Sequence, residues 1–403
     1  MNRTLYPQFS FDIQEQDLNS RARLGLISTP HGAIETPNFI FCATKGAMKA
    51  LRMDMVKETE AQIILSNTYH LMLNPGADLV EKMGGLHTFM NWNGPLFTDS
   101  GGFQIFSLGH GSIASEIKGN RMQKSSRSLL KITEHGATFK SYLDGRQHLL
   151  TPEKSIEVQV KLGADLIVVL DECTPFHVDK AYTERSMEMS HRWALRSLEE
   201  FKKRSKETQA LYGIIQGGVY EDLRKISTEF VNEHPFFGHA IGGSLGASKH
   251  QMSDVIGMTA PLLTRDRPIH LLGIGGISDI FEGVSLGIDT FDCVHPTRLA
   301  RHGGALVQPH LLPETKNASS REHLNLRNSL YKEDPNPIDL SCPCYTCQNL
   351  SRAYLHYLLK AKEIVVLELL TLHNITFMVR LMKAIREGIK QKNLPDLRKE
   401  WCS

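Results

Sequence analysis

The sequence predicts an α/β fold, a (β/α)8 TIM barrel followed by a C-terminal helical subdomain that is built around a cysteine cluster. Three observations support this prediction. Eight short, nearly continuous apolar segments alternate with amphipathic segments, a pattern typical of parallel strands buried on both faces. Polar residues or glycines follow most of the apolar segments. Three closely spaced cysteines lie beyond the last of them.

The composition is that of an ordinary globular protein. A chain of 403 residues exceeds the usual size of one domain unless the domain is a large barrel. Its net charge of +2 excludes a global electrostatic field for nucleic acid, so any basic surface must be local. The sequence contains no uninterrupted apolar run of about 18 residues and no signal-peptide core, which predicts a cytoplasmic protein without a membrane partner.

The elements follow one another in a regular order. Residues 1–35 are expected to form an N-terminal β lead-in, with strands at 9–13 and 22–28. The catalytic barrel is predicted over residues 36–310. Amphipathic segments such as 152–162 and 184–203 are expected to be crossover helices. The eight barrel strands are predicted at 38–42, 62–66, 96–99, 166–171, 211–216, 240–243, 270–274 and 290–294.

An open, doubly wound sheet is the alternative to the barrel. In a closed barrel the carboxyl ends of the strands converge on one mouth, where barrel enzymes hold their reacting groups. An open sheet would spread the same residues along an edge. We favour the barrel because six residues with functional potential follow six different strands, namely Asn67, Asp99, Asp171, Gln216, Gly243 and Asp292.

Two stretches depart from this alternation. An insertion at about residues 109–135 is polar and locally basic. A mobile surface loop is its simplest interpretation, and contact with a polyanion is the alternative. From 311 to 403, a linker rich in Pro, Asn and Ser leads to the cysteines and then to helical sequence. This region is predicted to be a zinc-binding C-terminal subdomain.

The cysteines Cys342, Cys344 and Cys347 are spaced C-x-C-x₂-C. An odd total of seven cysteines with one tight cluster indicates reduced thiols and a metal rather than disulfides. Zinc requires four ligands in a tetrahedron, and four protein ligands leave no open position, which predicts one structural Zn²⁺ per chain. The candidates for the fourth ligand are His356, His373 and the more distant Cys402.

Several segments at the predicted mouth suit a polar, planar ligand. Asp99 precedes two glycines, which let the backbone approach a flat ligand, and Phe103, which can stack on it. Asp171 lies beside a second carboxylate, and carboxylates suit the amino-bearing edge of a base. Each feature alone also fits a tight turn or a salt-bridged strand end. Together with Asp292 they predict a glycosyl-transfer enzyme that acts on a nucleoside, with one acid as nucleophile and one as acid/base.

The sequence resembles the tRNA-guanine transglycosylases of the bacterial type along nearly its whole length. The resemblance lies in segments 66–71, 98–104, 171–175 and 291–298, and in the cysteine cluster with His373. Members of this family exchange the wobble guanine of tRNAs with GUN anticodons (Asp, Asn, His and Tyr) for a 7-deazaguanine in queuosine modification. The resemblance therefore implies a tRNA and a free 7-deazaguanine base as partners, and a homodimer.

The resemblance also implies roles for the matched residues. Asp292 would be the nucleophile that forms a covalent ribosyl-RNA intermediate, and Asp99 the general acid/base. The implied base-binding set is Asp99, Ser100, Gly101, Gly102, Phe103, Asp171, Gln216, Gly243 and Leu272. The implied RNA-binding set is Gly273, Ile274, Gly275, Gly276, Ile277, Ser278, Asp279, Thr297, Arg298, Leu299, Ala300 and Arg301. The implied zinc ligands are Cys342, Cys344, Cys347 and His373.

The chain departs from the family pattern after its second pair of glycines. Bacterial members carry Leu-Ala-Val-Gly-Glu where this chain has Gly246 at the Val position and Ser248 at the Glu position. In the family, that Glu accommodates the cationic aminomethyl group of the precursor base, and Gly at the Val position leaves room for the cyclopentenediol of queuine. We therefore expect a preference for queuine. His295 and Gly276 replace a usual Leu and Lys, which predicts RNA contacts that differ in detail.

Two other functions compete with this interpretation. A non-catalytic partner subunit would share the barrel but lack the acid pair, so the presence of Asp99 and Asp292 favours the enzyme. A metal-dependent barrel hydrolase would require a His-x-His pair at the first strand, and the sequence contains none.

Overall fold

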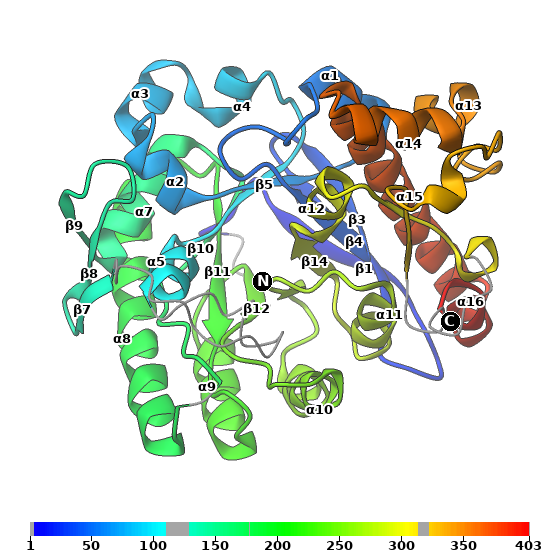
Figure 1. Ribbon diagram of the computed structural model, residues 1–403. Coiled ribbons are helices and arrows are strands. Elements are labelled where there is room, and N and C mark those ends of the chain that lie inside the picture. Colours follow the sequence, from blue (N-terminus) through cyan, green and yellow to red (C-terminus); the bar gives the residue numbers. More distant parts are fainter. Residues whose placement is uncertain (1–3, 110–128, 177, 313–321, 403) are drawn as a thin grey trace.

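A closed barrel of eight parallel strands forms the centre of the protein (Figure 1). The computed structural model describes residues 4–109, 129–176, 178–312 and 322–402. Each barrel strand pairs with the next one in the chain, and the last pairs with the first, which excludes the open-sheet alternative. The strands are β4 (Asn38–Cys42), β5 (Ile64–Ser66), β6 (Leu96–Thr98), β10 (Leu166–Val168), β11 (Ala210–Ile215), β12 (Gly238–Ile241), β13 (Ile269–Leu271) and β14 (Thr290–Cys293).

All eight predicted strands are present, but six of them end one to three residues earlier than the sequence predicts, and the difference is largest, three residues, in β10 and β13. The predicted strands continue to Asp171 and to Ile274, whereas the observed strands end at Val168 and Leu271. Beyond these ends the backbone enters the loops of the barrel mouth. Asp171 and Leu272 consequently lie on loops rather than on the strands themselves.

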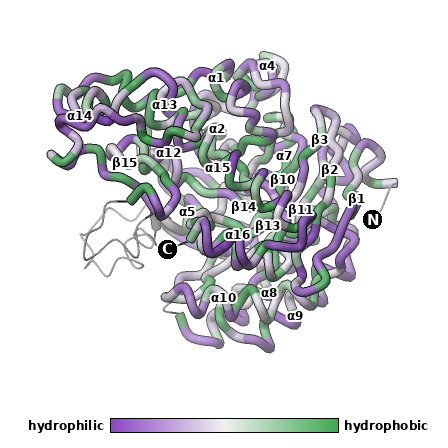
Figure 2. Tube along the Cα trace, turned by 90° about the vertical axis from the view of Figure 1, so that its right-hand side faces the viewer, coloured by the Kyte–Doolittle hydropathy of each residue, from purple (hydrophilic) through white to green (hydrophobic). Residues whose placement is uncertain are grey.

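Helices cover the outside of the barrel (Figure 1). The predicted helices at 152–162 and 184–203 are confirmed as α7 (Pro152–Leu162) and α8 (Lys180–Arg204). Figure 2 shows hydrophobic and hydrophilic residues alternating along α8, α9 and α10, as expected for helices buried on one side. The remaining crossovers contain α1 (Met53–Glu58), α2 (Thr68–Leu73), α3 (Ala77–Lys82), α4 (Gly85–Met90), α5 (Gly102–Gly109), α9 (Glu221–Glu233), α10 (Lys249–Thr259), η1 (Ala260–Leu262) and α11 (Ile277–Ser285).

An antiparallel sheet of β1 (Ser10–Gln16), β2 (Arg23–Thr29) and β3 (Gly32–Thr36) lies at the amino end of the barrel. Arg23 is fully buried and donates two hydrogen bonds, of 2.8 and 2.6 Å, to Asp289, the residue before β14. It also donates to the carbonyl of Arg267, just before β13, at 2.9 Å. This sheet therefore covers the amino ends of the strands and leaves the carboxyl ends for the chemistry.

A second antiparallel sheet adjoins the predicted insertion. Its strands are β7 (Leu129–Thr133), β8 (Gly136–Lys140) and β9 (Gln147–Leu150), and the sequence analysis did not anticipate it. Phe139 of this sheet packs on Tyr69 with ring centroids 5.3 Å apart. Residues 110–128, the larger part of the predicted insertion, lie outside the described residues.

The C-terminal region packs directly on the barrel. It contains β15 (Gly304–Leu306), η2 (Pro309–Leu311), β16 (His323–Asn325), η4 (Ser329–Tyr331), α13 (Tyr345–Asn349), α14 (Arg352–Ala361), α15 (Val365–Lys390) and α16 (Leu394–Trp401). α15 contacts β4 and α12 (His295–Arg301). Buried Asn374 of α15 receives the Leu306 N–H at 2.8 Å and donates to the Pro296 and Gly304 carbonyls. The division of the chain at residues 35 and 310 remains a prediction.

The long helix α15 is apolar enough, by length and composition, to span a membrane, and it is the one such helix among the described residues. Of its most apolar window, 72% is buried inside the protein. Packing against the barrel and the C-terminal helices therefore accounts for its apolar character.

Candidate active site and metal centre

Asp99, Asp171 and Asp292 lie together at the carboxyl end of the barrel. Asp99 is the residue after β6, Asp171 lies on the loop that follows β10, and Asp292 is the next-to-last residue of β14. The negative charge of Asp292 contributes to the raised pKa of Asp99, and the charge of Asp99 contributes to that of Asp171. The predicted convergence of these side chains on one mouth is therefore observed.

Asp99 is oriented by donors from the β5–α2 connection. The Thr68 N–H donates to Oδ1 at 2.8 Å, and the Asn67 amide donates to Oδ2. The Thr68 hydroxyl donates to the Asp99 carbonyl at 2.6 Å. Burial raises the pKa of Asp99 to about 6, although both donors oppose this shift. A carboxyl group with this pKa can exchange a proton near neutral pH.

Asp292 presents two unequal oxygens. Oδ1 receives the Gly273 N–H at 2.9 Å and lies 3.2 Å from Nε2 of His270. Oδ2 has the Cys42 thiol at 3.9 Å. The side chain is 14% exposed, so a ligand can reach it. Neither His270 nor Cys42 was expected from the sequence, because each looks like an ordinary residue of a buried strand.

Asp171 and Gln216 form a hydrogen-bonded polar pair at the mouth of the barrel. The Gln216 carboxamide donates from Nε2 to Oδ2 of Asp171. Burial raises the pKa of Asp171 to about 7, with contributions from the charges of Glu172 and Asp99. Glu172 points elsewhere and receives the Tyr182 hydroxyl at 2.5 Å. Asp171, rather than its neighbour, is therefore the carboxylate that belongs to the site.

Arg224 of α9 holds the two glycine-containing loops beside this pair. It is fully buried and donates to the carbonyls of Gly218 (2.7 Å), Ile215 (3.2 Å), Gly242 (2.9 Å) and Ser244 (3.2 Å). These carbonyls flank Gln216 and Gly243 on either side. Burial lowers the pKa of Arg224 to about 9. Its role was not expected from the sequence, because an arginine in an amphipathic helix normally faces solvent.

The residues predicted to hold a planar ligand include an exposed aromatic side chain and a closely packed stretch of backbone. Phe103 of α5 leaves 49% of its surface exposed. A Cβ on Gly102 would lie 2.8 Å from the Asp171 carbonyl, so only glycine lets α5 approach the Asp171 loop this closely. Leu272 is half-buried and borders Gly242. Ser100 and Gly101 connect Asp99 to this helix, and the Ser100 carbonyl receives the Ser155 hydroxyl at 2.7 Å.

The predicted RNA-binding residues fall into exposed and buried positions. Gly273 and Arg298 are exposed, and Ile274, Gly276, Ser278, Asp279, Leu299 and Arg301 are half-buried. Gly275, Ile277, Thr297 and Ala300 are buried. The Ile277 N–H already donates to Glu322 at 3.1 Å. RNA contact therefore stays a prediction for this set, and the solvent-facing members are its accessible part.

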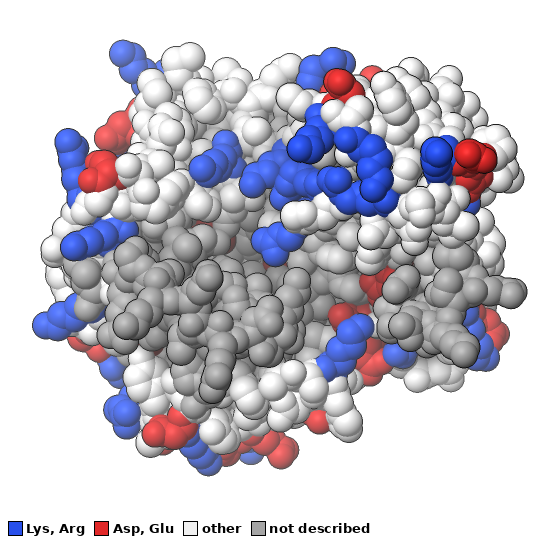
Figure 3. Space-filling model, in the orientation of Figure 1, with Lys and Arg blue, Asp and Glu red and all other residues white. Residues whose placement is uncertain are grey.

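A group of cations, missed by the sequence analysis, adjoins Arg298. Lys45 and Lys49 lie on the β4–α1 connection, and burial together with Arg301, Lys45 and Arg298 lowers the pKa of Lys49. None of Lys45, Lys49, Arg298 and Arg301 has a carboxylate within 4.0 Å in the described part of the chain. Figure 3 shows Lys and Arg gathered along one side of this face. A net charge of +2 conceals such a local concentration.

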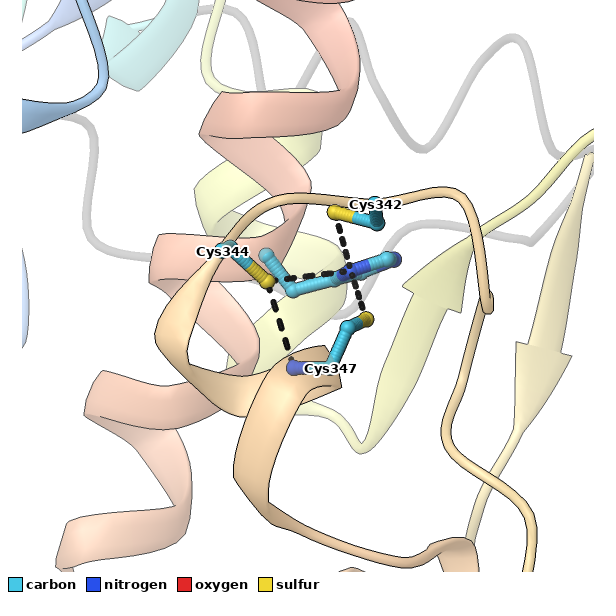
Figure 4. A group of neighbouring side chains, drawn as sticks. Cys342, Cys344 and Cys347 are labelled. Atoms are coloured by element: carbon cyan, nitrogen blue, oxygen red, sulfur yellow. Dashed lines mark hydrogen bonds between the residues drawn. The ribbon is translucent and has the colours of Figure 1, made fainter.

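Cys342, Cys344, Cys347 and His373 form a buried group able to bind a metal ion (Figure 4). The Sγ atoms of the three cysteines, taken in chain order, lie 3.7, 3.8 and 3.3 Å from Nδ1 of His373. A tetrahedral zinc with three sulfurs and one nitrogen requires S···N separations of roughly 3.5 Å. The other ring nitrogen donates to the Leu306 carbonyl at 2.8 Å, which fixes the orientation of the ring.

The two alternative fourth ligands lie elsewhere. Nδ1 of His356 is 2.8 Å from the Leu326 carbonyl, and neither His356 nor Cys402 belongs to the metal-binding group. His373 is therefore the fourth member of the group able to bind a metal. All seven cysteines are unpaired, in agreement with the prediction of reduced thiols.

Comparison with known proteins identifies the family. A family profile described as queuine tRNA-ribosyltransferase matches residues 17–403. The chain is 49% identical to a queuine tRNA-ribosyltransferase of Roseiflexus sp. (strain RS-1), over 97% of this chain and 98% of that protein. It is 45% identical to that of Protochlamydia amoebophila (strain UWE25), over 95% and 96% respectively. The chain therefore belongs to the queuine tRNA-ribosyltransferase family, whose members are glycosyltransferases of the pentosyltransferase class.

Proposed function

We propose that this enzyme exchanges the wobble guanine of tRNAs with GUN anticodons for a 7-deazaguanine, through a covalent ribosyl-RNA intermediate on Asp292. The observation that carries the proposal is the pairing of two differently held carboxylates at one barrel mouth. Asp292 keeps one oxygen largely free, while both oxygens of Asp99 receive hydrogen bonds and its pKa is about 6. The first arrangement suits a nucleophile and the second suits a proton carrier.

The reaction consists of two displacements at C1′ of the ribose. In the first, Oδ2 of Asp292 bonds to C1′ while the C1′–N9 bond breaks, and guanine leaves with the electron pair and takes up a proton from solvent water at N9. In the second, Asp99 accepts the N9 proton of the incoming base, whose nitrogen bonds to C1′. The ester bond then breaks and returns the electron pair to Asp292. Two inversions retain the configuration of the sugar.

Base recognition is assigned to the pocket around Asp171. Its carboxylate would accept the N–H groups of the guanine edge, while Gln216 and the Gly243 backbone contact the remaining polar atoms. Phe103 and Leu272 would lie on the two faces of the ring. Half of the Phe103 surface is exposed, which supports this role, since a stacking partner would cover it.

The tRNA is proposed to lie along Arg298 and Arg301, with its phosphates reaching the neighbouring Lys45 and Lys49. These cations lack carboxylate partners in the described part of the chain, which leaves their charge available. Phosphate contacts of this kind supply affinity without reading sequence. The GUN specificity would therefore come from the base pocket and from nucleotides held near it.

Two assembly features are also proposed. The metal is proposed to be Zn²⁺ with a structural role, because three thiolates and one imidazole would occupy all four tetrahedral positions. A homodimer is supported by exposed aromatic residues on α14, where Tyr354 and Tyr357 are 45% and 61% exposed and their rings stack. Ile364, 79% exposed, lies at the start of the next helix. Free thiols throughout the chain support a cytoplasmic location.

We propose that queuine is preferred over the aminomethyl precursor. The loop at 244–248 contains no carboxylate to neutralise a cationic substituent. The residue at the family's Glu position is Ser248, and its hydroxyl already caps α10 by accepting the Gln251 N–H at 3.2 Å. Gly246 adds no side chain to this part of the mouth, which supports space for a larger neutral substituent.

Trapping of covalent RNA tests the central proposal. We expect the wild type, incubated with tRNA and quenched in denaturant, to retain a fraction of the RNA covalently, and Asp292→Ala to retain none and exchange no labelled guanine. Asp396→Ala, an exposed aspartate substitution on α16, is the matched control. Undiminished exchange by Asp292→Ala would contradict the mechanism. Absence of both exchange and trapping in the wild type would favour the non-catalytic subunit.

A further inference from the structure

We propose that His270 is a positioning residue for Asp292, donating from Nε2 to Oδ1 so that Oδ2 is the oxygen that bonds to the ribose. This inference rests on the proposed function and adds a residue to its machinery. His270 lies on β13, next to the strand that carries Asp292. No residue role implied by the family resemblance includes it.

One imidazole ring contacts two side chains of β14. His270 is fully buried, with its ring centroid 5.0 Å from that of Phe97. Nδ1 lies 3.0 Å from the Thr290 hydroxyl, and Nε2 lies 3.2 Å from Oδ1 of Asp292. Thr290 and Asp292 are two positions apart on one strand, so their side chains share a face. The ring therefore lies beneath both of them.

The surroundings of the ring determine which nitrogen carries the proton. A lone pair on Nε2 would repel the carboxylate oxygen that it faces, so Nε2 carries a hydrogen. In the neutral ring, Nδ1 then accepts from the Thr290 hydroxyl. Nε2 is completely buried and makes no aligned hydrogen bond with any described group. Its nearest acceptor is Oδ1 of Asp292, so the donor is available to this oxygen when the carboxylate reorients.

Two donors thus converge on one oxygen of the nucleophile. Gly273 and His270 both face Oδ1, whereas among the described residues Oδ2 has only a weakly donating thiol at 3.9 Å. Oδ2 is therefore the oxygen free to bond to C1′, and Oδ1 becomes the carbonyl oxygen of the ester. When the second displacement breaks the ester, negative charge returns to the carboxylate. A donor at Oδ1 stabilises that charge and makes Asp292 a better leaving group.

This role predicts a particular kinetic signature. Without the His270 donor, the carboxylate is a poorer leaving group but not a poorer nucleophile. The second displacement is then slowed more than the first, and the covalent intermediate accumulates. Loss of one hydrogen bond to a charged group corresponds to roughly a tenfold change in rate. Binding of tRNA, which does not involve the buried ring, is expected to stay unchanged.

Three variants test the inference. His270→Leu removes both nitrogens and keeps similar volume, His270→Gln keeps an N–H donor, and Thr290→Val removes only the partner of Nδ1. For His270→Leu we expect kcat for guanine exchange to fall about tenfold with an unchanged kcat/KM for tRNA, while the trapped covalent fraction rises. His270→Gln should recover most of the lost kcat. Thr290→Val should show a smaller change in the same direction.

The outcomes separate this inference from the function on which it rests. A wild-type kcat and covalent fraction in His270→Leu would overturn the role of His270 alone, provided that Asp292→Ala traps no RNA. A parallel fall of kcat and covalent fraction, with a lowered thermal midpoint and no recovery in His270→Gln, would show a merely structural residue and also overturn it. Exchange by Asp292→Ala would overturn the proposed function itself.

Discussion

The Gln216 carboxamide donates a hydrogen bond to Oδ2 of Asp171, and this bond joins the ends of two neighbouring barrel strands at the base pocket. Donors normally lower the pKa of a carboxyl group. Burial outweighs this donor, and the pKa of Asp171 lies at about 7. The group proposed to accept the N–H groups of the base is therefore only half ionised at neutral pH.

This pKa predicts how base binding depends on pH. Only ionised Asp171 accepts two N–H bonds, so the affinity for guanine should fall as pH drops below about 7, approaching tenfold per unit. Protonation of Asp99, whose pKa is about 6, should lower kcat at still lower pH. Guanine-exchange kinetics measured across this pH range test both the affinity for guanine and kcat. Asp171→Asn should bind guanine weakly at every pH, and a KM that still titrates near neutrality in this variant would contradict the assignment.

Arg224 is predicted to control the shape of the base pocket. Arg224→Lys replaces five planar donors by a single ammonium group, which cannot satisfy four carbonyls in different directions. We expect the KM for the base to rise about tenfold and the free energy of unfolding to fall by about 3 kcal/mol, measured by exchange kinetics and denaturant titration. Arg192→Lys, a half-exposed arginine on α8, is the control. An unchanged KM in Arg224→Lys would exclude this role.

The barrel and its acids could be predicted from the sequence, whereas Arg224 and His270 could not. The barrel was predictable because a strand buried on both faces is apolar throughout, and because Asp99, Asp171 and Asp292 each lie at or near the carboxyl end of such an apolar segment. The roles of Arg224 and His270 could not be predicted. The partners of Arg224 are backbone carbonyls and the partner of His270 is a carboxylate, and only the closed barrel brings these groups near the two side chains. The sheet of β7, β8 and β9 was missed because it interrupts the strand–helix alternation with short, partly exposed strands.

Lys49 is predicted to contact the tRNA backbone. Lys49→Ala should weaken tRNA binding several-fold at moderate ionic strength and reduce the slope of log K against log salt by about 1, because one fewer counterion is released. The KM for guanine should not change. Lys202→Ala, on the outer helix α8, provides a lysine control remote from the mouth. Filter binding at several salt concentrations measures the slope, and an unaltered slope in Lys49→Ala would remove this residue from the interface.

Loss of the metal is predicted to loosen the C-terminal region. Cys344→Ser should reduce the zinc content from one ion per chain to nearly none, because three remaining ligands bind zinc far more weakly. The thermal midpoint should fall by several degrees, since the metal connects the cysteine loop to α15, which packs on the barrel. Elemental analysis and thermal unfolding measure the two effects. Cys402→Ser, outside the group, should retain the metal, and full zinc occupancy in Cys344→Ser would refute the site.

Ser248→Glu is predicted to shift the choice of base. A carboxylate at this position would attract the cationic aminomethyl group, so kcat/KM for the precursor should rise about tenfold relative to queuine. Ser248→Gln has the same shape without the charge, and both variants lose the cap on α10, so their ratio isolates electrostatics. Competition of the two bases in the exchange assay measures the preference. Equal preferences in the Glu and Gln variants would show that this position does not select the base.

Gly246→Val is expected to behave differently from either substitution. Gly246 has a φ of 103°, and a Cβ there would lie 2.5 Å from Cβ of Gln251. Valine would therefore force the loop to move rather than simply narrow the pocket, and exchange of both bases should decline together. If valine instead excluded queuine while leaving guanine exchange intact, the side chain at this position would act as a direct steric filter. The two substitutions thus distinguish selection by charge at Ser248 from selection by loop shape at Gly246.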